Sequence, residues 1–65
     1  MITVFHRTRR GASQGDCFTQ WKEAEEKLRR LFAQRIEAKA VRDDEVVGRV
    51  WKDNGHWNWY MEIES

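Results

Sequence analysis

The dipeptide Asn54-Gly55 constrains the fold of this chain more than any other feature of the sequence. It separates two short runs, 46–53 and 56–63, in which apolar and polar residues largely alternate. A type I′ turn needs positive φ at both central residues, and Asn followed by Gly tolerates this conformation best. The sequence therefore predicts a β-hairpin closed by a two-residue turn.

The two-residue turn also predicts the register of the hairpin. It pairs Asp53 with His56, Val50 with Trp59, Gly48 with Met61, and Val46 with Ile63. Side chains alternate across a strand, so these positions share one nearly apolar, core-facing surface with Trp57. It comprises Val46, Gly48, Val50, Trp57, Trp59, Met61 and Ile63. The opposite face then carries Val47, Arg49, Trp51, Asn58, Tyr60 and Glu62. A three-residue loop over 53–55 is the alternative, and it would place Trp51 opposite Trp57 in the core.

Before the hairpin, the pattern predicts one strand and one helix. Residues 2–7 are β-branched and aromatic and read as a strand with Ile2 and Val4 facing inward. Residues 8–16 read as a mobile loop, and a helix follows, capped by Asp16 or Thr19 and fraying between Arg35 and Lys39. Its apolar stripe comprises Phe18, Trp21, Ala24, Leu28, Leu31, Phe32 and Ile36. Residues 40–45 read as a charged connection.

These elements predict a fold of the α+β class in a single domain over 1–65. We expect a β-α-β-β order, with one helix packed on a three-stranded antiparallel sheet in the order 1-3-2. The strand 56–63 is the most apolar, so it is expected in the middle, and the strand 46–52 becomes an exposed edge. The helix covers one face of the sheet and the other face stays open. A homodimer through the exposed edge or the open face is an alternative to a monomer.

Charge and cysteine content bear on the location and the partners of the protein. The net charge is +1, from 12 basic and 11 acidic residues, which is not typical of a nucleic-acid binder. The single cysteine, Cys17, excludes an intramolecular disulfide and fits a reducing compartment. The N-terminus lacks the pattern of a secretory signal, and no apolar run reaches membrane-spanning length. We expect a cytoplasmic protein without membrane contact.

No pattern in the chain predicts catalysis. Gly11 and Gly15 lack the spacing of a phosphate-binding loop. Cys17, His6 and His56 match no metal-ligand spacing, and Cys17 is interpreted as a small apolar residue near the helix start. The sequence predicts no catalytic residue, no metal site and no cofactor, and hence no enzyme.

Two binding hypotheses remain. In the first, the open sheet face binds another protein, from a host or a second copy, through Arg49, Trp51, Asn58 and Tyr60. In the second, the protein binds nucleic acid through its N-terminal basic residues, which are His6, Arg7, Arg9 and Arg10. The exposed hairpin aromatics Trp51 and Tyr60 stack on bases, and Arg49 joins the N-terminal arginines in contacting phosphate. A further alternative for Trp51 is that it only covers the sheet edge.

In its small size and single-domain build, the chain resembles the short accessory proteins of phages, prophages and plasmids. Anti-CRISPR proteins are among these, and many members act by binding a host protein. The resemblance implies a protein-binding role and assigns no role to any residue.

Overall fold

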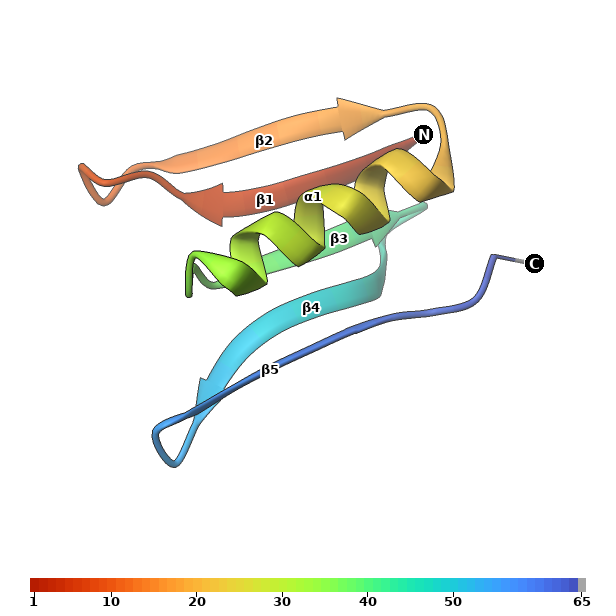
Figure 1. The fold of residues 1–65 in the computed structure, drawn as a ribbon. Helices are drawn as coiled ribbons and strands as arrows, with labels where there is room; N and C mark the ends of the chain where they lie inside the picture. Colours follow the sequence, from red (N-terminus) through yellow and green to blue (C-terminus); the bar gives the residue numbers. More distant parts are fainter. Residues whose placement is uncertain (65) are drawn as a thin grey trace.

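The computed structural model describes residues 1–64, which form one sheet and one helix (Figure 1). In chain order the elements are β1 (Ile2–Arg7), β2 (Ser13–Phe18), α1 (Trp21–Ala33), β3 (Ala38–Arg42), β4 (Glu45–Asp53) and β5 (His56–Met61). The strand order is β2-β1-β3-β4-β5, and every neighbouring pair is antiparallel. The helix lies across one face of the sheet, and the other face carries no element of residues 1–64.

The predicted three-stranded sheet in the order 1-3-2 is wrong, because the sheet has five strands. Residues 13–18 form β2, which takes in the end of the predicted loop 8–16 and the expected helix start at 17–18. Residues 38–42 form β3, which replaces the expected fraying end of the helix and the first part of the predicted connection 40–45. β3 lies between β1 and β4, so β4 is an interior strand and β2 and β5 are the edges. A homodimer through an exposed edge at 46–52 is therefore excluded, since that strand is paired on both sides.

The hairpin at Asn54-Gly55 forms as predicted. The two residues have φ values of 50° and 80°, and Val50 pairs with Trp59. The three-residue alternative is thereby excluded. A second two-residue turn follows the same rule, since Asp43 and Asp44 have φ values of 52° and 64° and join β3 to β4. Asp tolerates this conformation better than most residues, but its signal is weaker than that of Asn-Gly.

A β-bulge in β4 reverses the predicted orientation of two valines. Ala40 pairs with Gly48 but Val41 pairs with Val46, so Val47 is the extra residue. Val47 is 1% exposed and joins the core, whereas Val46 is 42% exposed. The predicted pairing of Val46 with Ile63 does not occur, because β5 ends at Met61.

The helix is shorter than predicted and begins without a side-chain cap. Gln20 is its N-cap and makes no capping hydrogen bond, while Asp16 belongs to β2. The helix ends in a Schellman arrangement: Ile36 N–H donates to Leu31 O and Arg35 N–H donates to Phe32 O. Arg35 has a φ of 58°, which ends the helix sharply at Ala33 where fraying was expected.

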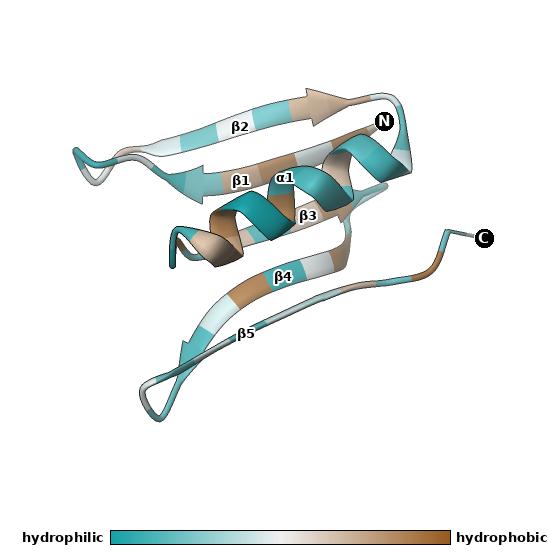
Figure 2. Cartoon of the chain, in the orientation of Figure 1, coloured by the Kyte–Doolittle hydropathy of each residue, from teal (hydrophilic) through white to brown (hydrophobic). Residues whose placement is uncertain are grey.

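The core lies between α1 and the sheet. Its buried residues come from α1, β1, β3 and β4, and each of these elements carries hydrophobic residues in Figure 2. Ile2 and Val4 face inward as predicted, and Leu28 is fully buried over the middle of the sheet. At the edge strand β5, the ring of Trp59 packs against that of Phe32, with ring centres 6.3 Å apart.

Two contacts hold the start of the helix in place. The Trp21 indole Nε1–H donates to the carbonyl oxygen of Glu62 at 3.0 Å, and the guanidinium of Arg42 lies 4.8 Å from the Trp21 ring centre. These contacts tie the start of α1 to the end of β3 and to the segment after β5. In residues 1–64, no helix combines the length and apolar character needed to cross a membrane.

Candidate binding face

The sheet face away from α1 is called the open face. Its centre is a row of four side chains, one from each of four neighbouring strands: Phe5, Lys39, Arg49 and Tyr60. They are direct cross-strand partners, since Phe5 pairs with Lys39, Lys39 with Arg49, and Arg49 with Tyr60. We call these four residues the central row. Along the row, the cations Lys39 and Arg49 lie between the aromatic rings of Phe5 and Tyr60.

Trp51 and Asn58 adjoin the central row on β4 and β5 and are paired with each other. The ring of Trp51 meets that of Tyr60 edge to face, with centres 6.0 Å apart, and the Arg49 guanidinium lies 5.7 Å from the Trp51 ring centre. The Asn58 amide donates to the carbonyl oxygen of His56 at 3.3 Å. The four residues predicted to bind a protein therefore lie together on one surface, with Trp51 half-buried.

Phe5 belongs to this surface but was not in the predicted site. Its ring covers Gly15, where a Cβ would lie 3.1 Å from Phe5 Cε1, and the Lys39 ammonium lies 6.0 Å from the ring centre. Phe5 is 37% exposed and Tyr60 is 41% exposed. Because side chains alternate between the two faces of a strand, the predicted inward orientation of Ile2 and Val4 already implied that Phe5 faces outward. Its place beside Lys39 depends on β3, a strand that the sequence pattern did not predict.

The central row holds two like charges in direct opposition. Lys39 and Arg49 are cross-strand partners and both are exposed. The ion pairs formed within residues 1–64 are His6–Asp16, Lys27–Asp16 and Arg29–Glu25, and none of them neutralises the central row. Like charges directly opposite each other on neighbouring strands destabilise a sheet. The pair therefore costs stability in the free protein.

Among residues 1–64, the carboxylates near the open face lie toward its ends, and Glu62 is one of them, just beyond β5. Glu37 precedes β3, Asp44 is in the β3–β4 turn, and Asp53 precedes the Asn54-Gly55 turn. Glu37 lines an open hollow of about 350 Å³ together with Phe5, Arg7, Lys39, Arg49 and Trp51. The middle of the face is thus positive, and Glu37 is the acidic residue that reaches its hollow.

The four N-terminal basic residues are separated by the structure. Arg7 is at the end of β1, paired with Ser13 on the open face, and Arg9 and Arg10 are exposed in the β1–β2 turn. His6 points to the other face, where its Nε2 lies 3.3 Å from Asp16 Oδ2. The arginines border one end of the open face, whereas the His6 ring is engaged with Asp16.

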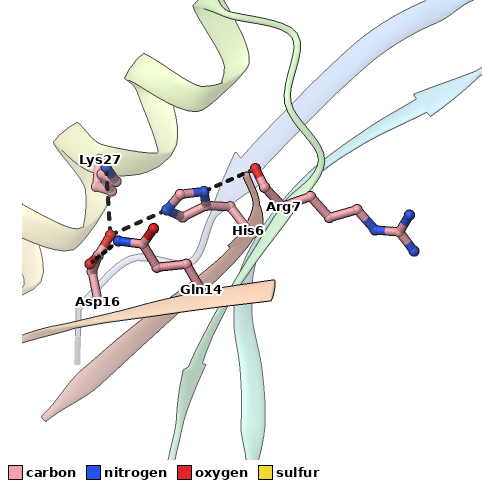
Figure 3. A network of polar contacts seen from close by, with 5 residues as sticks. All are labelled: His6, Arg7, Gln14, Asp16 and Lys27. Carbon is pink, nitrogen blue, oxygen red and sulfur yellow. Dashed lines mark hydrogen bonds and ion pairs between the residues drawn. The ribbon is translucent and has the colours of Figure 1, made fainter. Parts of the chain in front are cut away.

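His6 belongs to a polar network that joins β1, β2 and α1 (Figure 3). Asp16 accepts hydrogen bonds from His6 and from the Gln14 amide at 3.2 Å, and it forms an ion pair with Lys27, whose Nζ lies 3.6 Å from Asp16 Oδ2. Partial burial raises the pKa of Asp16, but the hydrogen bonds from Gln14 and His6 and the charge of Lys27 outweigh it. The pKa of this carboxyl therefore lies below its ordinary value.

Cys17 lies on the edge strand β2, shortly before the start of α1, and it is exposed, although the sequence suggested a small apolar packing residue there. Its sulfur lies 3.6 Å from the Thr3 hydroxyl oxygen. In the part of the chain that the structure describes, no three or more His, Cys, Asp or Glu side chains gather as a metal site. The open face, with its opposed cations and exposed aromatic rings, is the candidate functional surface.

Comparison of the chain with protein-family models, with curated protein sequences and with solved structures gives no match.

Proposed function

We propose that this protein is a non-enzymatic binding module that acts through the open face of its sheet. The observation that carries the proposal is the opposed pair Lys39 and Arg49, exposed between aromatic side chains and unpaired with any carboxylate of residues 1–64. Such a pair lowers the stability of the free protein. A ligand that neutralises both cations recovers that cost.

The neighbouring side chains support a binding role. Trp, Tyr and Arg are the residues most enriched at the energetic centres of interfaces, and Trp51, Tyr60 and Arg49 are in mutual contact here. Their contacts hold the rings in defined positions, so less side-chain freedom is lost on binding. The proposal includes the two partner classes expected from the sequence, a protein and a nucleic acid. We also propose that the protein is cytoplasmic and that it acts as an accessory protein of the phage, prophage or plasmid type.

The test is capture of partners from a host lysate by immobilised protein, with and without nuclease treatment. We expect Trp51→Ser to reduce capture about tenfold or more, because loss of an interface anchor costs about 2 kcal/mol or more. The free energy of unfolding should change by no more than about 1 kcal/mol, because Trp51 lies outside the core cluster.

The matched control is Ile63→Ser, which removes an apolar side chain that is 94% exposed and lies beyond β5. It should leave capture unchanged. If Trp51→Ser captures as much as the unaltered protein, the open face is not the working surface. The β1–β2 turn, with Arg9 and Arg10, then becomes the next surface to examine.

A further inference from the structure

We infer that the ligand of the open face is single-stranded nucleic acid, with a backbone phosphate held between Lys39 and Arg49 and bases stacked on the flanking aromatic rings. This inference rests on the proposed function and assigns the chemical class of its ligand. It is carried by the order of side chains in the central row.

The two cations define where the phosphate binds. Side chains directly opposite each other on antiparallel strands have Cβ atoms about 4.5–5.5 Å apart, so one phosphate can accept hydrogen bonds from both Lys39 and Arg49. The guanidinium offers a planar pair of donors, and the ammonium adds a point charge. The bound phosphate converts a repulsive pair into a bridged one.

The aromatic rings flank this position on both sides. Phe5 and Tyr60 are separated by three strand spacings, about 14 Å in all at about 4.8 Å each, with the two cations between them. Gly15 supports the Phe5 ring, and Trp51 supports the Tyr60 ring through its edge-to-face contact. Base stacking on such rings tolerates any sequence, because every base has a flat face.

This order of groups favours a single strand over a duplex. In a duplex the base faces are stacked inside the helix, so exposed aromatics on a sheet gain nothing from it, whereas splayed bases of a single strand stack on them. It also favours nucleic acid over an acidic polypeptide. Carboxylates satisfy the cations, but a single strand supplies an anionic backbone and flat apolar faces in the same repeating unit.

The cationic surface continues beyond the central row. Arg7 lines the same hollow as Lys39 and Arg49, and Arg9 and Arg10 follow in the β1–β2 turn. Glu37 lies in this hollow as its acidic member. The Glu37 charge therefore tests the sign of the ligand's charge. Removing it should strengthen the binding of a polyanion and weaken the binding of a cationic ligand.

The experiment measures fluorescence anisotropy of labelled oligonucleotides of about 15 nucleotides, a length near the upper site size of single-strand-binding domains. The probes are oligo-dT, oligo-rU, a duplex of the same length and a poly-glutamate peptide, each over a series of salt concentrations. We expect one or both single strands to bind at least tenfold more tightly than the duplex and the peptide. The two single-stranded probes distinguish DNA from RNA.

The variants separate phosphate contact from stacking. The double variant Lys39→Gln/Arg49→Gln should weaken binding at least tenfold and reduce the slope of log affinity against log salt by about 0.7, because the two cations hold one phosphate and each phosphate contributes about 0.7 on single strands. Phe5→Leu and Tyr60→Leu should weaken binding and leave the slope unchanged. Glu37→Gln should tighten binding.

The matched control is Lys22→Gln/Arg30→Gln, which removes two exposed cations from α1 and should leave affinity nearly unchanged. Thermal unfolding of each variant verifies the fold, and Lys39→Gln should raise the melting temperature because it relieves the repulsion with Arg49. If the control weakens binding as much as the central-row variant, binding is non-specific and the inference is overturned.

The outcomes also separate this inference from the proposed function. If no single strand binds but Trp51→Ser still abolishes capture from a nuclease-treated lysate, the open face binds a protein and the nucleic-acid inference fails alone. Tight binding of poly-glutamate in place of single strands likewise overturns the nucleic-acid inference alone. If Trp51→Ser affects neither capture nor oligonucleotide binding, both proposals fail.

Discussion

Gly48 lies where the helix packs tightly against the sheet. A Cβ at this position would lie 2.5 Å from Met61 Sδ and 2.6 Å from Leu28 Cδ1. Leu28 is fully buried, so it has little room to move away. The missing side chain is therefore what lets α1 lie flat against β4.

We expect Gly48→Ala to lower the free energy of unfolding by about 1–3 kcal/mol, as overpacking of a tight core does. Urea denaturation measures it. Gly15→Ala is the matched control, because the atoms nearest to its Cβ would belong to the Phe5 and Thr3 side chains on the open face, which can move. Equal costs for the two variants would contradict the close packing of Leu28 on Gly48.

At the scale of elements, α1 ends because of backbone geometry and not because its apolar stripe stops. Ile36 still packs against the core, yet the helix ends at Ala33. Arg35 adopts a left-handed conformation with a φ of 58°, where glycine is the usual residue. A side chain in this conformation carries a steric cost of about 1 kcal/mol or more.

We expect Arg35→Gly to stabilise the protein by about 1 kcal/mol, because it removes this cost and keeps the Schellman hydrogen bonds. The measurement is the urea midpoint with an unchanged slope. The control is Gln34→Gly at the preceding residue, whose φ is −85°; there glycine only adds entropy to the unfolded chain and should destabilise by about 0.5–1 kcal/mol. Destabilisation by both variants would show that the Arg35 side chain is itself stabilising.

At the scale of the whole molecule, near-zero net charge conceals an uneven distribution. Cations occupy the centre of the open face, while the polar network around Asp16 lies on the helix side and joins three elements. The net charge of +1 is not typical of a nucleic-acid binder, but this value averages the charge over both faces of the molecule. The charge of one face is a better guide to a ligand than the charge of the chain.

The Asp16 network predicts a pH dependence of stability. Because the folded-state pKa of Asp16 is lowered, its ionised form stabilises the fold above the ordinary aspartate pKa, and this contribution is lost as pH falls through the folded value. We expect Asp16→Asn to melt at a lower temperature than the unaltered protein at about pH 6. The difference should narrow below about pH 4. Melting curves followed by circular dichroism measure it, and a difference that stays constant down to about pH 2 would contradict the assignment.

The sequence alone determined the features that depend on short-range sterics. Asn54-Gly55 fixed its own turn and, with it, the pairing of Arg49 with Tyr60 and of Val50 with Trp59. Helical spacing identified the stripe that contains Leu28, and alternation oriented Ile2 and Val4. The reason is that φ preferences and side-chain periodicity act between residues near in sequence.

Only the tertiary structure decided where the remaining strands lie and which residues share the open face. β2, with the sequence SQGDCF, has no apolar alternation and forms because the edge of β1 offers backbone hydrogen bonds that any sequence can make. The bulge at Val47 likewise depends on pairing with β3. Because β3 was not predicted, Lys39 and Phe5 were absent from the predicted site. The chain brings them to Arg49 only through long-range strand pairing, which backbone groups form without a local signature in the sequence.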